Sequence, residues 1–144
     1  MMKYIDGPVV LHRLMIPVLP DFLSDVEIRG TFDCSYNDLK TLKNCPSSVT
    51  QNFICKHNKL SDLIGSPKEV KGYYDCSHNE LESFKGAPTT IYKDFTSFNN
   101  QIKSLEGIPK QIKGDFWMSD NRGKKFTEEE IRAVSNIKGL VFID

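Results

Sequence analysis

The sequence lacks a long apolar stretch, a net charge and an excess of lysine and arginine. No apolar run approaches the roughly 18 residues that a membrane-spanning helix needs. Nineteen basic and nineteen acidic side chains give a formal net charge of zero, so the positive excess typical of a general nucleic-acid or membrane-surface binder is missing. We therefore expect neither nucleic acid nor a membrane among its partners. With 39% hydrophobic and 26% charged residues, the composition is that of a folded domain.

Cysteine is scarce, and the features of a secretory leader are missing. Residues 1–11 contain one lysine, an aspartate and a proline before a short apolar run, without the basic start and cleavage site of a signal peptide. This predicts a cytoplasmic location, where thiols stay reduced. The four cysteines are therefore not expected to form disulfides.

Sequence motifs of catalysis are also missing. There is no G-x-S-x-G nucleophile elbow, no G-x-x-x-x-G-K-[ST] phosphate loop and no H-E-x-x-H zinc motif. No acidic residue is expected at an inward position, where burial would raise its pKa for acid catalysis. We predict no enzyme activity and no cofactor.

A repeat of 21 residues organises the middle of the chain. Asparagines recur at this step at Asn37, Asn58, Asn79, Asn100 and Asn121. An aromatic residue stands five positions before each of them, at Phe32, Phe53, Tyr74, Phe95 and Phe116. Further columns of like residues are apolar (Ile28, Val49, Val70, Ile91, Ile112) or proline (Pro46, Pro67, Pro88, Pro109). So many columns in register predict a repeat architecture.

Each unit contains a short alternating strand, a turn and a proline-containing return. One such coil cannot bury its own apolar side, whereas stacked coils can, with parallel strands about 4.8 Å apart. An inward asparagine at the bend offers a donor and an acceptor to backbone groups that the turn leaves unpaired. The asparagine column is therefore predicted to be a structural ladder.

The pattern F-x-C-x-x-N-x-L resembles the core of the leucine-rich repeat superfamily, and is most similar to the short repeats of bacterial effectors and small tailed-phage proteins. The resemblance covers residues 28 to about 126. It implies an α/β solenoid: a right-handed coil with a parallel β-sheet on its concave face and irregular returns. In this chain the first apolar position lies four residues before the aromatic instead of three, so a bulge is expected near the glycines of the repeat.

The whole chain, residues 1–144, is predicted to be one domain. Residues 28–122 hold five repeats, and residues 1–27 are interpreted as a cap, a strand or hairpin that seals the first coil. Residues 123–144 form the C-terminal cap. There Thr127 and Glu130 make a capping box that predicts a helix over about 127–136, and an apolar strand is expected over 140–143.

Two cysteines and two histidines suggest zinc, in the pairs Cys55-x-His57 and Cys76-x-His78. The cysteines, however, fall in the inward column, where a free thiol behaves as a small hydrophobe and Ser97 replaces it in a later copy. We therefore predict a structural role and no metal site.

The positions that alternate with the inward columns should face outward from the sheet. They place aromatic and apolar side chains outside, at Trp117, Phe98, Tyr73 and Ile54, among acidic ones at Asp33, Asp75, Asp94 and Asp115. Exposed tryptophan and tyrosine are typical of binding hot spots. Two alternatives stay open: Trp117 and Phe98 pack under the C-terminal cap, and the acidic columns are a solvated face.

These patterns predict a non-enzymatic module that captures a partner protein carrying a basic patch. The resemblance to phage proteins implies that the partner is a host factor, which a phage-encoded inhibitor would occlude in the host cytoplasm. The alternative is a structural protein that self-assembles through the same surface or through its coil edges.

Overall fold

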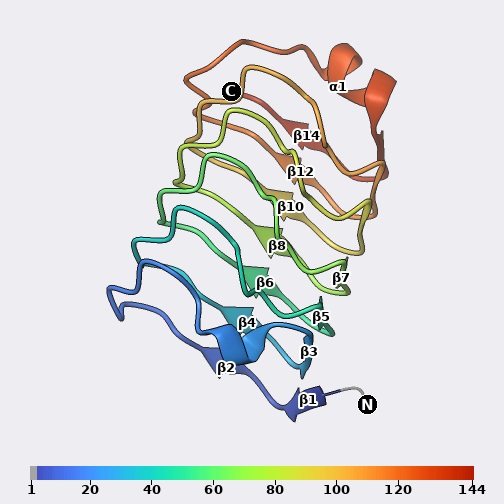
Figure 1. Cartoon of the computed structure of the whole chain (residues 1–144). Coiled ribbons are helices and arrows are strands. Elements are labelled where there is room, and N and C mark those ends of the chain that lie inside the picture. The colour runs from blue at the N-terminus through green and yellow to red at the C-terminus, as the bar shows by residue number, and fades with distance from the viewer. Residues whose placement is uncertain (1–2) are drawn as a thin grey trace.

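The computed structural model describes residues 3–144 and is a parallel β-solenoid of about seven turns with one short helix near its C-terminal end (Figure 1). The prediction of stacked coils with parallel strands is therefore confirmed. Each turn contributes one strand to each of two seven-stranded sheets, which we call sheet A and sheet B. We number the coils one to seven from the N-terminus, each with one strand of sheet A followed by one of sheet B.

Both sheets are built from very short strands. Sheet A contains β1 (Lys3–Asp6), β3 (Val26–Arg29), β5 (Ser48–Val49), β7 (Glu69–Val70), β9 (Thr90–Ile91), β11 (Gln111–Ile112) and β13 (Asn136–Ile137). Sheet B contains β2 (Val9–Val10), β4 (Phe32–Asp33), β6 (Phe53–Ile54), β8 (Tyr74–Asp75), β10 (Phe95–Thr96), β12 (Phe116–Trp117) and β14 (Val141–Phe142). All the strand pairs are parallel and join consecutive coils, as in Ile28 beside Val49 and Phe32 beside Phe53.

The second sheet differs from the single sheet with irregular returns that the sequence led us to expect. The apolar column that contains Ile28 forms sheet A, and the aromatic column that contains Phe32 forms sheet B, with only Gly30 and Thr31 at the corner between β3 and β4. The polar residues on both sides of Ile28 were the missed signal, since this alternation is typical of a half-buried strand.

The core consists of the inward columns of both sheets and of the returns. The aromatic column of sheet B is fully buried, and its rings contact their neighbours along the stack, with centroids 5.9 Å apart for Phe32 and Phe53 and 5.7 Å apart for Phe95 and Phe116. Leu39, Leu60 and Leu81 close the core on the side of the returns and have no exposed surface. Stacking thus buries in each inner coil the apolar side that a single coil would expose.

The first coil is built from strands, one of the two forms expected for residues 1–27, and does not form a hairpin. Strands β1 and β2 pair in parallel with β3 and β4, so they do not pair with each other. Between them and β3 lies a short 3-10 helix, η1 (Asp21–Leu23). Large apolar side chains of this coil are exposed, among them Val10, Met15 and Phe22. The N-terminal end therefore presents apolar surface, where a sealed cap was expected.

The C-terminal coil contains the expected helix, α1 (Glu128–Val134). Thr127 is its N-cap, and both hydrogen bonds of the capping box with Glu130 are present. The helix is shorter than the range 127–136 because Ser135 donates a hydrogen bond to the Pro109 carbonyl and Asn136 begins β13. In the part of the chain that the structure describes, no helix is long and apolar enough to cross a membrane.

Candidate functional site

The outward side of sheet B carries the side chains that the sequence singled out, and we call it the sheet B face. Its central column runs from Asp33 through Ile54, Asp75 and Thr96 to Trp117, with each residue paired in register to the next. All five are half-buried. The column continues to Val10 at one end and to Phe142 at the other.

Three aromatic side chains gather at the C-terminal end of this face. The Trp117 ring stacks on the Phe142 ring with centroids 3.7 Å apart and planes within 12°, and the Phe98 ring lies 5.6 Å away at a tilt of 54°. The C-terminal cap thus covers one face of the tryptophan through Phe142, and all three residues stay half-buried. We call Phe98, Trp117 and Phe142 the aromatic cluster.

Phe142 was not among the residues predicted from the sequence. The 21-residue step does not reach it, because the last coil contains α1 and the register shift from Trp117 to Phe142 is 25 residues. The available signal was the apolar run at the C-terminus, which could have been aligned on the preceding strand.

Tyr73 and Ile54 lie on the same face but outside the aromatic cluster. Tyr73 directly precedes β8 and Ile54 belongs to β6, two and three coils away from Trp117 in β12. The pKa of Tyr73 is raised, first by burial and then by the carboxylates of Asp75 and Asp33. Tyr73 therefore sits in an acidic and partly enclosed environment.

Two of the predicted acidic residues hold neighbouring coils together. The Asp94 carboxylate accepts a hydrogen bond of 2.8 Å from the Asp115 amide, and the Asp115 carboxylate accepts one of 2.8 Å from the Leu140 amide. Asn52 acts in the same way on the Tyr73 amide. We call Asn52, Asp94 and Asp115 the corner braces.

The corner braces account for the alternating glycines of the repeat. A Cβ atom at Gly72, Gly114 or Gly139 would overlap the side-chain oxygen of Asn52, Asp94 or Asp115 and the backbone of the preceding coil. In the column of these glycines, two other coils carry Gln51 and Lys93. The coils that precede those two have Thr31 and Tyr73 at the brace position. Glycine occurs at the first three positions because the preceding coil carries an asparagine or aspartate brace. Gly30, in the same column, follows Pro8 and is crowded by the backbone of Gly7 and Pro8 instead.

The other two predicted acidic residues, Asp33 and Asp75, accept hydrogen bonds from within their own coils. Asp33 accepts hydrogen bonds from the amide and the hydroxyl of Ser35, and Asp75 accepts one from the Ser77 amide. His12 lies 3.5 Å from the second carboxylate oxygen of Asp33. The carboxylates of the face are thus held in place by the backbone.

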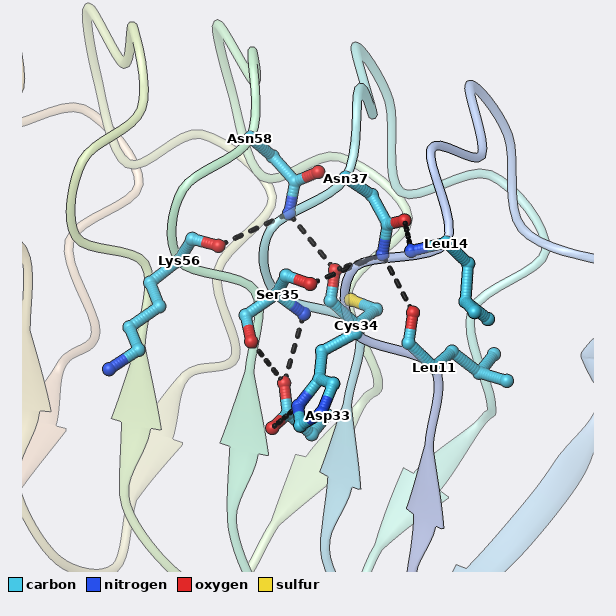
Figure 2. A network of polar contacts seen from close by, with 9 residues as sticks. Leu11, Leu14, Asp33, Cys34, Ser35, Asn37, Lys56 and Asn58 are labelled. Carbon is cyan, nitrogen blue, oxygen red and sulfur yellow. Dashed lines mark hydrogen bonds and ion pairs between the residues drawn. The ribbon is translucent and has the colours of Figure 1, made fainter.

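The asparagine column lies along one line beside sheet B, and Figure 2 shows two of its members, Asn37 and Asn58, with some of their partners. The Asn58 amide group donates to the carbonyls of Cys34 in the preceding coil and Cys55 in its own, while its oxygen accepts from the Leu39 amide. Asn79 and Asn100 repeat this pattern one and two coils further. Each of these side chains joins two coils at the bend.

The terminal members of the ladder vary the pattern. Asn37 accepts from the amides of Leu14 and Ile16 and donates to the Leu11 carbonyl of the first coil. Asn121, in the sixth coil, donates to the carbonyls of Ile102 and Lys124 and is half-buried.

The residue before each ladder asparagine turns the chain in a left-handed conformation that the sequence did not reveal. The φ angles in this column lie between 52° and 57°, at Tyr36, His57, His78, Asn99 and Asp120. The Tyr36, His57 and His78 rings stack, with centroids 4.3 and 4.1 Å apart. The pKa of His57 is lowered, first by burial and then by His78 and Lys56.

The thiols and imidazoles of the suggested zinc site are separated. Cys55 and Cys76 have no exposed surface, and burial raises their pKa well above the ordinary value for a thiol. His57 and His78 lie on the outside of the same bend. Within residues 3–144, no group of three or more histidine, cysteine or acidic side chains is placed to hold a metal ion.

Comparison with known proteins finds no relative of this chain. No family model, no curated protein and no solved structure matches the chain. Functional inference therefore depends on the geometry of the sheet B face and of the solenoid ends.

Proposed function

We propose that the protein is a non-enzymatic module that binds a partner protein on the sheet B face. The aromatic cluster carries the proposal, because Trp117 offers a large, partly exposed surface fixed between Phe98 and Phe142. Such anchors dominate the free energy of binding in protein interfaces. In this proposal the face is the concave side of a leucine-rich-repeat-like coil.

The rigidity of the face supports the proposal. Its central column from Asp33 to Trp117 stands on strands paired on both sides, and its carboxylates are bonded to backbone amides at Asp75, Asp94 and Asp115. A surface that is ordered before binding loses little conformational entropy when the partner docks. The module would act by occluding the partner's own site.

The charges of the face suggest the chemistry of the partner. Three carboxylates lie on coils four to six, close to the aromatic cluster: Asp75, Asp94 and Asp115. A partner with an apolar centre and a basic rim would match this arrangement and would be steered to it. A host factor bound by a phage-encoded inhibitor in the host cytoplasm is the specific form of this proposal.

Substitution of Trp117 and of Tyr73 tests the face. Trp117→Ala should weaken capture of the partner by about 30-fold or more, as expected for a hot-spot side chain, and Tyr73→Ala should weaken it less. Affinity capture from lysate of the source cell would identify the partner, and titration of the purified partner would give the affinities.

Ile64→Ala is the matched control, since Ile64 is 50% exposed but lies on a return, away from sheet B. Equal affinity of Trp117→Ala and Ile64→Ala for the partner would rule out the aromatic cluster as the binding site.

The acidic residues are best tested without breaking the corner braces. Asp94→Asn with Asp115→Asn removes two charges but keeps an oxygen that can accept the amides of Asp115 and Leu140. We expect the association rate constant to fall several-fold at low salt and to change little at high salt, because screening removes steering. Stopped-flow or biosensor kinetics would measure it.

Asp62→Asn is the control for these two substitutions, because the Asp62 carboxylate also accepts a backbone amide, that of Ile64, but on a return. If the double variant and this control associate at the same rate at low salt, the steering role is wrong.

A further inference from the structure

The two ends of the solenoid differ in how their backbone hydrogen bonds are completed. In sheet A, the amide of each coil donates to a carbonyl of the preceding coil, as Lys138 does to Ile112 and Gly139 does to Gly114, both at 2.9 Å. An eighth coil would use the carbonyls of Ile137 and Gly139 in the same way. These are two of the acceptors that the last coil offers on sheet A. The Ser135 carbonyl stands in the column of a third, in which Asn136 donates to Lys110.

Arg132 of α1 occupies both acceptors. Its Nη1 donates to the Ile137 carbonyl at 2.6 Å, and its Nη2 donates to the Gly139 carbonyl at 2.8 Å. Its Nε donates to Glu128 at 2.7 Å, which fixes the guanidinium from the helix side. Arg132 therefore replaces the two amide donors of a missing next coil.

Among residues 3–144, no side chain caps sheet B in this way at the same end. There the amides of Phe116 and Met118 donate forward to the carbonyls of Leu140 and Phe142. The amides of Val141 and Ile143 stand in the same two columns, but β14 is the last strand of the sheet. An edge of this kind is a template for a further strand.

The first coil has the side chains that a strand stacked on the last coil would need. Suppose that coil one of a second copy is stacked on coil seven, with the columns kept in register. Ile137 then lies beside Ile5, Phe142 beside Val10 and Ile143 beside Leu11, and all six residues are apolar. The same extension brings Lys138 to Asp6, an oppositely charged pair. The two ends are thus complementary in their columns.

Exposure at the N-terminal end agrees with this match. Val10 is 53% exposed, whereas the residues of its column in coils two to six, from Asp33 to Trp117, are half-buried. Gly7 has no atom within 4 Å of where its Cβ would stand, while glycines in inner coils are crowded by the preceding coil. The first coil therefore has room for a coil beneath it.

We propose that the N-terminal coil is a docking surface for the C-terminal coil of a second copy, and that Arg132 keeps this surface unused in the isolated chain. While the guanidinium holds the carbonyls of Ile137 and Gly139, the incoming strand β1 cannot pair with β13. Once it is withdrawn, both sheets continue across the junction. Because this contact joins unlike ends, it extends the stack with every added copy.

Removal of the cap tests the proposal. Arg132→Gln keeps a polar side chain and the helix propensity, but the shorter glutamine loses the charge and the two-pronged donor. We expect the mass measured by light scattering to rise with concentration past that of a dimer, while the wild type stays monomeric. Electron microscopy should show rods that lengthen in steps of roughly 34 Å, the thickness of seven coils.

Two further variants make the test specific. Arg122→Gln removes another exposed arginine, on a return, and should stay monomeric. Adding Val10→Lys to Arg132→Gln places a charge at the docking surface and should restore the monomer. Circular dichroism would establish that each variant is folded. If Arg132→Gln does not fold, Arg132→Ala would be tested in its place.

Several outcomes would overturn the proposal. A monomeric Arg132 variant would mean that the ends do not fit, and assembly insensitive to Val10→Lys would mean that another surface is responsible. Growth that stops at the dimer would indicate pairing of two N-terminal ends. Wild-type protein that assembles as readily as the variant would deny Arg132 its role. None of these results bears on the sheet B face, whose binding is tested separately.

Discussion

Replacement of Asn79 by alanine is expected to lower the free energy of unfolding by on the order of 3 kcal/mol or more. The side chain is 3% exposed, accepts the Leu60 amide at 3.0 Å and donates to the carbonyls of Cys55 and Cys76 at 3.1 Å. Alanine would leave the Leu60 amide without a partner in the core, at a cost of about 1–3 kcal/mol that water entering the cavity offsets only in part. The carbonyls of Cys55 and Cys76 would each lose one hydrogen bond, worth about 1 kcal/mol, and keep another, from Asn58 and Asn100. Urea unfolding would measure the loss as a lower midpoint at an unchanged slope.

Asn121→Ala is the matched control within the same column. Asn121 also accepts an amide of the preceding coil, that of Ile102 at 2.6 Å, but it is half-buried and another of its bonds goes to the carbonyl of Lys124, which is exposed, so water can replace its bonds. We expect a smaller loss than for Asn79→Ala, of about 1 kcal/mol. Equal losses for the two variants would show that burial does not determine the contribution of the ladder.

Replacement of Gly86 by alanine is the second substitution for which we expect a large loss, of about 3 kcal/mol or more. Gly86 has a φ of 95°, a conformation that disfavours a side chain, and a Cβ there would overlap the backbone of Leu63 and Ile64 in the preceding coil. Thermal unfolding would show it as a fall in the melting temperature. The neighbouring coils cannot separate locally, because the ladders on either side hold them together.

Gly7→Ala separates the two causes of that loss. Gly7 has nearly the same φ, 96°, but nothing lies within 4 Å of its Cβ position. Its substitution should cost about 1 kcal/mol from backbone strain alone. If Gly7→Ala were as damaging as Gly86→Ala, close contact between coils would not be the cause.

The architecture was predictable because it depends on residues that recur at a fixed step. The inward columns follow directly from that step, since a coil whose apolar side chains match those of its neighbours must stack on them. The capping box of Thr127 and Glu130 was equally readable, because it depends only on residues three positions apart. The position of the asparagine column at the bend was also predictable, because an inward asparagine can bond the backbone groups that a turn leaves unpaired.

Other features depend on contacts between coils that the sequence pattern does not encode. The paired columns of Asp94 and Gly114 were visible, but only the three-dimensional structure brings the carboxylate over the glycine. The left-handed turn at His57 was not anticipated, although histidine, asparagine and aspartate, which fill most of its column, are enriched in that conformation among non-glycine residues. Arg132 escaped notice because its acceptors, Ile137 and Gly139, belong to strand ends that no motif marks.

The candidate binding face was predicted in composition but only partly in arrangement. Alternation placed Trp117 and Asp75 on the same side of sheet B, where they lie. It could not show that Phe142 would stack on Trp117, because the helix in the last coil breaks the 21-residue step. Nor could it show that Asp94 and Asp115 hold the backbone, since a charged residue at a surface position is usually solvated.

The corner braces also determine where the protein could be shortened or lengthened. Excision of residues 73–93 would bring Asp94 directly after Gly72, so that Asn52 and Asp94 each keep a glycine in the coil that follows. Excision of residues 63–83, also one full period, would place Lys93 in the coil that follows Asn52, where its Cβ would meet the asparagine oxygen. Whole turns can therefore be removed without this overlap wherever each brace keeps a glycine in the coil that follows it.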